Sequence, residues 1–521
     1  MYSVHLYTKY MTKHIDVVIA GAGPVGLLSA IELTLGGAQV LVLERLASPS
    51  QAMKALSFGP LAGEALLRRG MRTAIDDAQA RAADAMRAFT EQTGADLRVR
   101  ASKFNGHFAG LSLIRRDAQV DPERRPRHVD QPSLEAMLAE RARALGIEVR
   151  RAHDITAIEA SDDGVQVTWR SPSAAGSGHI RADYLIGCDG GRSTVRKLCG
   201  FAFPGTEPTL TFYQAIADVD HPEALATVGW NRTPHGVFCY GPVPGRLFML
   251  DFSGPPGDRL APVSRAEIED VLRRTSGKDV RLHALHSASR WADNTRLVDT
   301  YRQGRVFLAG DAAHVHSPFG GQGLSLGLLD AANLGWKLAA VIRGDMPDSL
   351  LATYTAERRP VAEAVLANTR AQVAILRPDP QSGAMRDLIA RLMDFDDVNR
   401  FIGEMMTGVS TRYDLGATGT THPDVGRLAG DWQLAGGAYL YDAMQEGNGV
   451  LLDATPWQRA SQIVAAVTPS VRCVTVSEGP SMLLRPDACI AWRSEGENTE
   501  RLAGPEGLDG LKVALRQWFT A

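Results

Sequence analysis

The sequence predicts an α/β fold built around a parallel sheet, because three apolar runs far apart in the chain each end in a turn that contains glycine. The first run, residues 15–20, precedes Gly21-Ala22-Gly23-Pro24-Val25-Gly26. The second run, residues 184–187, precedes Cys188-Asp189-Gly190, and the third, residues 306–309, precedes Gly310-Asp311. Because open α/β sheets bind ligands at the carboxyl ends of their strands, the ordered set predicts one ligand site.

The length and composition indicate a soluble globular protein of two or three domains. The chain has 521 residues, of which 45% are hydrophobic and 22% are charged. A formal net charge of −3 gives no electrostatic case for binding nucleic acid or an anionic membrane. No apolar run approaches the roughly 20 residues that a membrane helix needs, and residues 1–14 lack the apolar centre of a signal peptide. We therefore expect a cytoplasmic protein with residues 1–14 as an N-terminal extension.

The cysteines and histidines give no sign of a metal or disulfide centre. The five cysteines stand far apart and form no Cys-x-x-Cys pair, which argues against a disulfide framework, a zinc site or a dithiol redox centre. His314 and His316 are two residues apart, a spacing that does not suit one helix face, and no acidic or cysteine partners cluster around them in the sequence. We therefore expect no metal ion.

The N-terminal segment is predicted to be a strand, a helix and a second strand. Residues 15–20 suit a strand that is buried on both faces. Pro24 opens a helix whose apolar residues recur at helical spacing, and Gly36-Gly37 end it. Residues 41–43 then form the second strand, which Glu44 follows. This order is typical of a dinucleotide-binding unit.

The glycines of the first turn have distinct physical tasks in such a unit. Gly21 permits the tight turn, Gly23 lets the backbone approach a diphosphate, and Gly26 lets helix and strand pack closely. The helix N-terminus then offers free backbone amides to the phosphates. Glu44 is placed to accept hydrogen bonds from ribose hydroxyls. A bare glycine pattern also occurs in unrelated loops, but here the flanking strands, the helix and Glu44 stand in register.

The turn after the third run predicts a second part of the same site. Asp311 emerges at the carboxyl end of a buried strand. Residues 318–323, Pro-Phe-Gly-Gly-Gln-Gly, bring bare backbone close to a flat group, and a helix is expected to begin near Leu324. The positive end of that helix would stabilise negative charge on a reduced flavin. The three segments together indicate FAD, with Asp189 near the diphosphate and the path of a reductant.

The middle of the chain predicts a sheet that forms the wall of a substrate cavity. Asp162-Asp163-Gly164 lies between two alternating apolar runs and predicts a hairpin. Residues 210–252 are rich in aromatics and broken by proline and glycine, as expected for short strands around a cavity. The residues of this sheet that we expect to contact the substrate are Tyr213, His235, Phe238 and Tyr240.

A long helical region follows the third run, and residues 377–380 interrupt it. The composition changes again after about Gly416, which predicts a separate C-terminal module. We therefore expect an FAD-binding domain from residues 15–200 and 296–415, a substrate-binding β-sheet domain from residues 201–295, and a third domain from residues 421–521.

These motifs resemble those of the single-component FAD-dependent aromatic hydroxylases of the para-hydroxybenzoate hydroxylase type, in particular the branch acting on polyketides, phenols and rifamycin-like antibiotics. The resemblance covers nearly the whole chain. Besides the three turns it rests on Gln131-Pro132-Ser133-Leu134-Glu135, on residues 183–196 and on residues 354–360. It implies a Rossmann-like FAD-binding domain with an inserted β-sheet substrate domain and a C-terminal thioredoxin-like domain. Without a Cys-x-x-Cys pair, that last domain is expected to be structural or to contact the partner in a homodimer.

The resemblance also implies which residues hold FAD. Glu44 is expected at the adenosine ribose, Gln131 at the flavin–ribityl region and Asp311 at the ribityl chain. The expected cofactor-binding residues are Gly21, Gly23, Pro24, Val25, Gly26, Glu44, Arg45, Lys54, Gln131, Asp189, Asp311, Pro318, Gly321, Gly323, Leu324 and Ser325. Lys54-Ala55 departs from the usual Arg-Ala, so a bidentate cation becomes a point charge. Leu324-Ser325 departs from the usual Leu-Asn, which removes the asparagine side chain.

The activity that the resemblance implies is an FAD monooxygenase of antibiotic biosynthesis. Such an enzyme uses NADPH or NADH and molecular oxygen to hydroxylate a phenolic or polycyclic aromatic substrate through a flavin hydroperoxide. The sequence has no second Gly-x-Gly-x-x-Gly unit, so we expect the nicotinamide nucleotide to bind only transiently. A Baeyer-Villiger or epoxidising monooxygenase would use the same site, and a non-catalytic flavin redox sensor is a third class. The missing Trp-x-Trp-x-Ile-Pro stretch disfavours a halogenase, and the unpaired cysteines disfavour a disulfide reductase.

Overall fold

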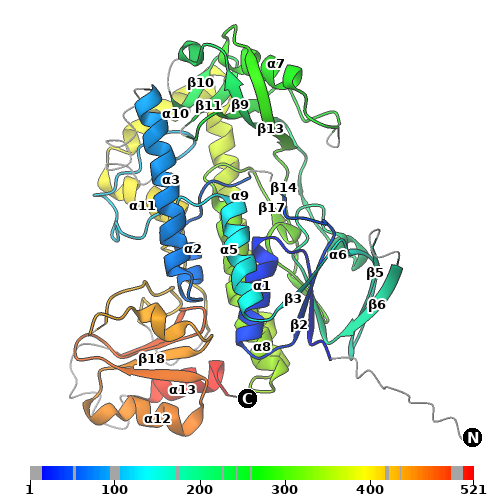
Figure 1. Cartoon of the computed structure of the whole chain (residues 1–521). Helices are drawn as coiled ribbons and strands as arrows, with labels where there is room; N and C mark the ends of the chain where they lie inside the picture. The colour runs from blue at the N-terminus through cyan, green and yellow to red at the C-terminus, as the bar shows by residue number, and fades with distance from the viewer. Residues whose placement is uncertain are drawn as a thin grey trace, which may run out of the picture.

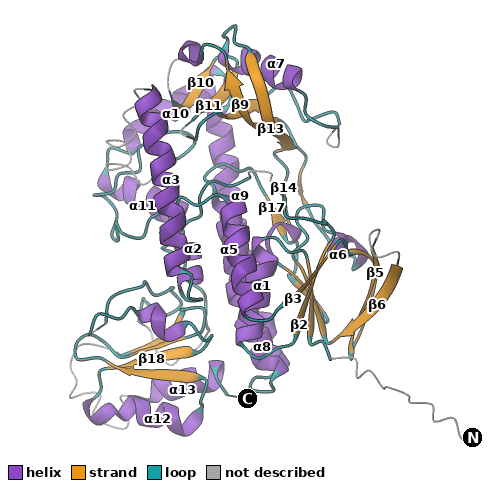
Figure 2. Ribbon diagram, in the orientation of Figure 1, coloured by secondary structure: helices purple, strands orange, loops and turns teal. Residues whose placement is uncertain are grey.

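The computed structural model describes residues 14–50, 54–93, 106–171, 176–225, 228–241, 243–258, 261–416, 422–434, 436–494 and 508–520. Figure 1 shows a long molecule in which the C-terminal part, coloured orange to red, and a green antiparallel sheet lie at opposite ends. The parallel sheet and the long helices α1, α5, α8 and α9 lie between them (Figure 2). Among the described residues, no helix has both the length and the apolar character to cross a membrane.

The central sheet has six strands in the order β15-β16-β7-β1-β2-β3. Their bounds are β1 Val17–Ala20, β2 Val40–Glu44, β3 Glu148–Arg151, β7 Tyr184–Gly187, β15 Arg302–Gln303 and β16 Val306–Leu308. β1 pairs in parallel with β2 and β7, β7 with β16, and β2 with β3, whereas β15 is antiparallel to β16. The three apolar runs of the sequence are therefore adjacent parallel strands, as predicted, and the turns after them share one edge of the sheet.

Long helices pack against this sheet and against one another. α1 (Pro24–Leu35) joins β1 to β2 and contacts both α5 (Gln131–Ala144) and α8 (Gln322–Ile342). α9 (Ala352–Leu376) packs on α8 and ends just before residues 377–380, where α10 (Pro380–Leu392) begins, so the predicted interruption is confirmed. Further helices of this part of the chain are α2 Pro60–Leu67, α3 Arg72–Thr93, α6 Thr194–Leu198 and α11 Asp396–Thr407. Short 3-10 turns lie at Pro222–Leu225, Gly310–Ala312, Asp348–Leu351, Leu440–Met444 and Pro456–Gln458.

Two small antiparallel sheets flank the central one. The first contains β4 Asp154–Ser161, β5 Gly164–Ser171 and β6 Gly176–Ala182. β4 and β5 pair across Asp162-Asp163, so the predicted hairpin is confirmed. The second contains β8 Gly205–Thr206, β14 Thr295–Leu297 and β17 His314–Val315, and it links the middle of the chain to the turn that follows β16.

The five-stranded sheet is fully antiparallel, in the order β10-β11-β12-β9-β13. Its bounds are β9 Thr211–Val219, β10 Gly229–Thr233, β11 Gly236–Tyr240, β12 Arg246–Asp251 and β13 Leu282–Ala292. α7 (Arg265–Ser276) packs on one face through its apolar residues Ile268, Val271 and Leu272. Successive side chains of a strand point to opposite faces, so each strand contributes to a core under α7 and to a second core on the other side.

The C-terminal part has a four-stranded sheet in the order β19-β18-β20-β21. Its strands are β18 Gly449–Asp453, β19 Val471–Thr475, β20 Met482–Leu484 and β21 Ile490–Arg493, and its helices are α12 Arg459–Val467 and α13 Asp509–Trp518. β18 and β19 are parallel, whereas β20 is antiparallel to both β18 and β21. Its buried apolar residues belong to the same continuous core as those of the central sheet, so this part is packed firmly onto the rest of the molecule.

Candidate functional site

A cavity of about 2120 Å³ extends from the carboxyl ends of the central strands to the five-stranded sheet. Gly21, Glu44, Asp189 and Asp311, which follow or end β1, β2, β7 and β16, all line it. All of the predicted cofactor residues line this cavity except Gly26 and Ser325. The fold therefore brings together side chains that are up to about 290 positions apart in the chain, at the edge where α/β sheets bind ligands.

The glycine turn leaves a hollow that a side chain would fill. Gly21 has a φ of +102°, and a Cβ there would lie 2.5 Å from the carbonyl oxygen of Cys188. A Cβ on Gly26 would lie 1.9 Å from the carbonyl oxygen of Gly21, so this glycine serves packing and does not face the cavity. A Cβ on Gly23 would meet no atom within 4 Å. The open space therefore lies at Gly23, as a bound diphosphate requires.

The N-terminus of α1 points into the same hollow. Gly23 is its N-cap and makes no side-chain capping bond, which leaves the first backbone amides of the helix for a ligand. Glu44 lies beside it, because its Oε2 accepts a hydrogen bond from the amide of Ala22 at 2.8 Å and its Oε1 one from the amide of Leu46 at 2.8 Å. A carboxylate oxygen accepts more than one hydrogen bond, so Glu44 keeps the capacity to bind ribose hydroxyls.

A buried ionic network fixes the turn that carries Asp311. Asp330 on α8 accepts hydrogen bonds from the amide of Gly310 at 3.1 Å, from His314 Nε2 at 2.7 Å and from Arg358 Nε at 2.8 Å. Burial alone would raise the pKa of Asp330, but Arg358 and His314 hold it below its ordinary value. The aspartate is therefore ionised, and His314 serves this support rather than a metal ion.

The second glycine loop ends at the N-terminus of α8. Gly321 is the N-cap, with a φ of 62° and no side-chain capping bond, and a Cβ there would meet no atom within 4 Å. Gly321, Gly323 and Leu324 all line the cavity. Two uncapped helix N-termini, those of α1 and α8, therefore face one cavity and make two sites for negative charge.

Two buried acceptor atoms in the cavity wall have no hydrogen-bond partner in the described part of the chain, namely Asp189 Oδ1 and His316 Nε2. The other oxygen of Asp189 accepts from the amides of Thr194 and Val195 at 2.6 and 3.1 Å. His316 donates its Nδ1 proton to the carbonyl oxygen of Ser317 at 2.7 Å, and burial lowers its pKa to about 4, so Nε2 carries a lone pair. Unsatisfied buried acceptors at a cavity suit a bound polar group.

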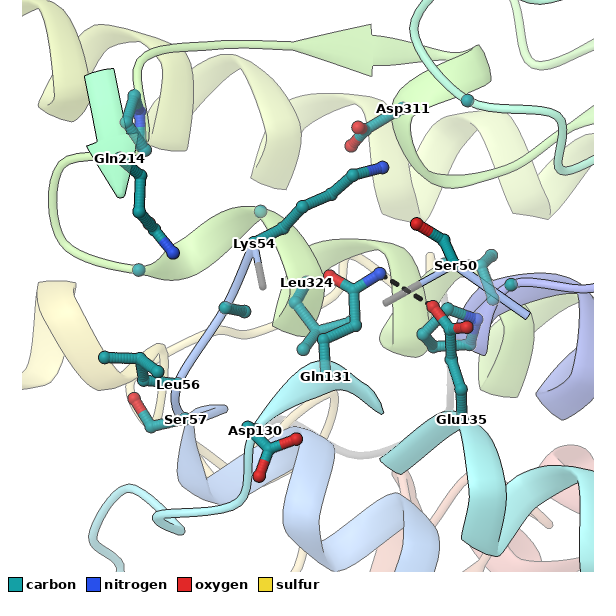
Figure 3. Close-up of a pocket in the computed structure, with 18 of the residues that line it drawn as sticks. Ser50, Lys54, Leu56, Ser57, Asp130, Gln131, Glu135, Gln214, Asp311 and Leu324 are labelled. Carbon is teal, nitrogen blue, oxygen red and sulfur yellow. Dashed lines mark hydrogen bonds between the residues drawn. The ribbon is translucent and has the colours of Figure 1, made fainter. Parts of the chain in front are cut away.

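The residues from other elements complete this end of the cavity (Figure 3). Gln131 begins α5, and its Nε2 donates to Glu135 Oε1 at 2.8 Å. Figure 3 shows the Lys54 side chain extended toward Asp311, with Gln131 close to Leu324. The cavity wall therefore brings a lysine side chain close to the turn that carries Asp311.

The other end of the cavity is formed by one face of the five-stranded sheet. Trp230, Cys239, Phe248, Gln214 and Ser289 are paired in register across the five strands, and all five line the cavity. Three further aromatic or apolar lining residues, Trp291, Phe319 and Ile114, extend this face. The ring centroids of Trp230 and Phe319 lie 5.2 Å apart, and those of Trp230 and Phe248 lie 5.5 Å apart. This end is therefore a chamber with aromatic walls, continuous with the space beside the glycine loops.

Two known protein families match this chain. The family model for an FAD binding domain matches residues 14–369, and the family model for the C-terminal domain of aromatic-ring hydroxylases matches residues 422–521. The chain belongs to the FAD-binding aromatic-ring hydroxylases. The expected cofactor, FAD, and the expected class of enzyme, a flavin monooxygenase of the para-hydroxybenzoate hydroxylase type, are thereby confirmed.

Characterised relatives of this hydroxylase are similar over almost their whole length. The 12-dehydrotetracycline 5-monooxygenase/anhydrotetracycline 6-monooxygenase of Streptomyces rimosus subsp. rimosus is 38% identical, over 97% of this chain and 98% of the relative. The rifampicin monooxygenase of Streptomyces venezuelae is 38% identical, over 92% of this chain and 96% of the relative. The solved structure of the OxyS anhydrotetracycline hydroxylase from Streptomyces rimosus superimposes with a TM-score of 0.82 at 36% identity, covering 98% of this chain and 100% of that one.

The four residues predicted to touch the substrate do not line the cavity of the hydroxylase. Tyr213, Phe238 and Tyr240 point to the other face of the five-stranded sheet, where they pack in the core under α7. Tyr213 donates a hydrogen bond to Glu267 of that helix at 3.2 Å. His235 is exposed at the tip of the β10–β11 hairpin. The expectation chose the wrong face, because an aromatic-rich strand does not reveal which of its two faces covers a helix.

Sequence analysis missed two polar residues of the chamber, His107 and Arg246. Both line the cavity, and His107 packs edge-on against Trp230 with 5.2 Å between the ring centroids. His107 lies in a loop with no recognisable pattern, so the sequence offered no signal for it. Arg246 begins β12 two residues before Phe248, and the strand period of two would have placed both on one face.

Ser325 stabilises a neighbouring helix and does not line the cofactor cavity. Its Oγ accepts a hydrogen bond from the amide of Gly59, the N-cap of α2, at 2.8 Å. Replacing Ser325 by alanine is therefore expected to lower the free energy of unfolding of the hydroxylase by about 1 kcal/mol, because that amide loses its acceptor. Thermal unfolding of the apoprotein and a fluorescence titration with FAD check this. If Ser325→Ala bound FAD more weakly at unchanged stability, the side chain of Ser325 would instead belong to the cofactor site.

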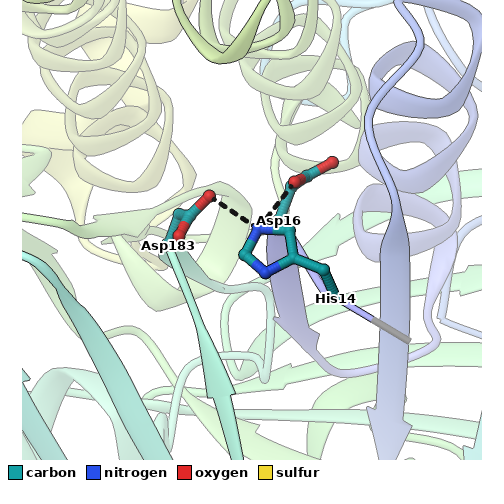
Figure 4. Close-up of side chains that lie close together, drawn as sticks. All are labelled: His14, Asp16 and Asp183. Atoms are coloured by element: carbon teal, nitrogen blue, oxygen red, sulfur yellow. Dashed lines mark hydrogen bonds and ion pairs between the residues drawn. The ribbon is translucent and has the colours of Figure 1, made fainter. Parts of the chain in front are cut away.

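A cluster of His14, Asp16 and Asp183 lies at the opposite edge of the central sheet (Figure 4). His14 Nε2 is 3.2 Å from both Asp16 Oδ1 and Asp183 Oδ2. Asp16 also accepts a hydrogen bond from the amide of Gln39 at 2.6 Å. These contacts tie together the amino ends of β1 and β7 and the segment before β2, which explains the cluster without a metal ion.

Proposed function

We propose that this hydroxylase inserts one atom of molecular oxygen into a bulky phenolic or polycyclic, polyketide-like substrate, with NADPH or NADH as the transient reductant. The observation that carries the proposal is one cavity that joins the two glycine loops to an aromatic chamber. The relatives named for tetracyclines and rifampicin support a large polycyclic substrate. A volume of about 2120 Å³ exceeds what FAD alone needs, and it leaves room for a multi-ring compound.

We assign the parts of FAD to the residues that face the cavity. The diphosphate lies on residues 21–26 and on the N-terminus of α1, and the adenosine ribose lies at Glu44. Gln131 and Asp311 flank the ribityl chain, and the backbone around Gly321 meets the pyrimidine edge of the ring. When bound, FAD supplies the redox chemistry that activates oxygen. The uncapped N-terminus of α8 stabilises negative charge beside the ring.

The chamber residues bind the substrate and exclude water. Flat apolar surfaces for a polycycle are offered by Trp230, Phe248, Trp291 and Phe319. Excluding water from this space prevents side reactions with water that would consume the activated oxygen without product. Gln214, at the centre of the paired row, supplies a polar contact that orients the rings. We assign the approach of the nicotinamide nucleotide to the part of the cavity wall near Asp189 and Arg192, where Arg192 is exposed.

We further propose three domains, with boundaries at residues 15–200 with 296–415, 201–295 and 421–521, and a thioredoxin-like topology for the last. The mixed sheet β19-β18-β20-β21 with α12 and α13 supports that topology. Its two cysteines, Cys473 and Cys489, do not form a Cys-x-x-Cys pair, so the domain has a structural role. A homodimer in which the C-terminal domain contacts the partner is also proposed. Sedimentation of the purified protein tests it.

The activity is tested with a panel of phenols, hydroxyanthraquinones and tetracyclic polyketides. The FAD-loaded enzyme is expected to consume NADPH or NADH faster with its preferred compound and to yield a product heavier by one oxygen atom. Labelled oxygen gas should supply that atom, and the product structure should carry a new hydroxyl group on an aromatic ring. A ring-expanded lactone as the product would indicate a Baeyer-Villiger monooxygenase, and an epoxide would indicate an epoxidising monooxygenase. Absence of any stimulated turnover across the panel would contradict a catalytic role.

A further inference from the structure

Arg246 is a cation in the wall of the substrate chamber for which the described residues provide no carboxylate partner. It begins β12, and its neighbour on the same face of that strand is Phe248, whose ring centroid lies 5.7 Å from the guanidinium carbon. Its Nε is shielded from solvent and has no hydrogen-bond partner among the described residues, and no carboxylate of these residues forms an ion pair with its guanidinium. Burial lowers the pKa of Arg246, and only the thiol of Cys239 opposes this effect.

Two other arginines near this end of the chamber are already used. Arg386 donates to the carbonyl oxygen of Ala109, and Arg232 donates to the carbonyl oxygens of Arg377 and Asp379, the latter at 2.9 Å. Neither side chain lines the cavity, whereas Arg246 does. Of these three cations, Arg246 alone therefore faces the chamber with its hydrogen-bonding capacity unspent.

His107 places a neutral donor at the same end. Its Nδ1 accepts a hydrogen bond from the amide of Gly110 at 3.2 Å, which puts the ring proton on Nε2. Burial, together with the nearby charges of Arg246 and Arg386, lowers the pKa of His107 to about 4. At neutral pH Arg246 therefore contributes a fixed positive charge to this end of the chamber, and His107 contributes a neutral N–H group.

A buried guanidinium nitrogen without a hydrogen-bond partner is costly unless a ligand supplies an acceptor or a counter-charge. The diphosphate of FAD is assigned to the glycine loop, at the far end of the same cavity, so it cannot serve Arg246. The group that reaches Arg246 must therefore belong to the molecule in the aromatic chamber. An acidic hydroxyl on an aromatic or enolised ring has the right chemistry, since its anion accepts hydrogen bonds from a guanidinium fork.

We propose that Arg246, assisted by His107, binds an acidic hydroxyl of the aromatic substrate as its anion, a phenolate or enolate. The proton of that hydroxyl leaves to bulk water on binding, and the negative oxygen accepts hydrogen bonds from the guanidinium. This contact selects acidic phenols over neutral polycycles and fixes which end of the substrate lies away from FAD. The inference rests on the proposed substrate class and makes it more specific.

The test compares two ligands that differ only at the acidic group. The FAD-loaded enzyme is titrated with 2-hydroxyanthraquinone and with 2-methoxyanthraquinone, and binding is followed by the flavin difference spectrum. Arg246→Met is expected to weaken binding of the hydroxyl compound by about 30-fold or more and to leave binding of the methyl ether nearly unchanged. The absorbance of the bound hydroxyl compound should show ionisation at a pH at least about one unit lower in the wild type than in Arg246→Met.

Two further variants keep the test independent of folding. Arg246→Lys retains the charge and should restore part of the selectivity, whereas Arg232→Met removes a nearby cation that does not line the cavity and should not discriminate between the ligands. The role of Arg246 would be overturned if Arg246→Met weakened binding of both ligands equally. It would also be overturned if the bound hydroxyl compound ionised at the same pH in the wild type and in Arg246→Met. Either result would leave the proposed substrate class standing. A wild-type enzyme that binds FAD but neither ligand would overturn the proposed substrate class as well.

Discussion

Gly23→Ala is expected to weaken FAD binding at least about 100-fold while the apoprotein unfolds at an unchanged temperature. Gly23 has a φ of −76° and a ψ of −178°, which any residue adopts, and the added Cβ meets no protein atom within 4 Å. The methyl group takes only the space of the diphosphate, and two lost charge-assisted hydrogen bonds at about 1.5 kcal/mol each account for the factor. Fluorescence titration with FAD and thermal unfolding of the apoprotein measure the two quantities.

Gly26→Ala is the matched control, because it adds the same methyl group three residues further along the turn. Its Cβ would lie 1.9 Å from the carbonyl oxygen of Gly21 and 3.3 Å from Cys188 Cβ, so the backbone must shift. This variant should lose FAD affinity and also lower the free energy of unfolding of the apoprotein by about 1–3 kcal/mol. If Gly23→Ala bound FAD as tightly as the wild type, the assignment of the diphosphate to the N-terminus of α1 would be wrong.

The cofactor end of the site was predictable because its signals are local. A glycine that needs a positive φ, a helix that begins with proline and a strand that ends in glutamate each follow from a few neighbouring residues, as at Gly21, Pro24 and Glu44. Parallel pairing then brings the ends of β1, β2, β7 and β16 together without any further specification. The side chain of Ser325 supports Gly59, so the cofactor contact that we predict for this residue is one of its backbone.

The substrate end was not predictable, because its residues are selected by tertiary packing. Tyr213 and Gln214 are neighbours in β9, yet one packs under α7 and the other lines the chamber. Nothing in an alternating aromatic strand says which face the helix will cover, and α7 comes more than 50 residues later. His107 and Arg246 approach the same chamber from unrelated segments, so only the folded chain reveals them.

The attachment of the C-terminal domain was likewise invisible in the sequence. Glu357 on α9 accepts hydrogen bonds from both terminal nitrogens of Arg485, at 2.7 and 2.8 Å, and from Lys337 Nζ at 2.8 Å. The side chains of Arg485 and Glu357 are 0% and 1% exposed. Arg485 comes from the turn between β20 and β21 and packs over Trp518, with 4.5 Å to the ring centroid. The C-terminal domain is thus held to the helix that also supports the Asp311 turn through Arg358.

Glu357→Gln is therefore expected to destabilise the protein by about 3–5 kcal/mol, because Arg485 and Lys337 stay buried with one carboxylate fewer. For a chain of this length the melting temperature should fall by roughly 3–5 °C, and residues 482–493 should become more accessible to hydrogen exchange.

Glu363→Gln, on the same helix, is the matched control. Its ion pair with Arg359 spans 3.6 Å between side chains that are 65% and 34% exposed, so losing it should cost at most about 0.5 kcal/mol.

Burial alone would raise the pKa of Glu357, but Arg485 and Lys337 hold it far below its ordinary value of 4.5. Below that pH the unfolded chain therefore binds a proton at Glu357 that the folded chain does not bind. The free energy of unfolding by which wild type exceeds Glu357→Gln is complete at pH 7 and must shrink as the pH falls below about 4.5. Equal melting temperatures for the two variants at pH 7 would mean that apolar packing alone, without this ion pair, holds the C-terminal domain in place.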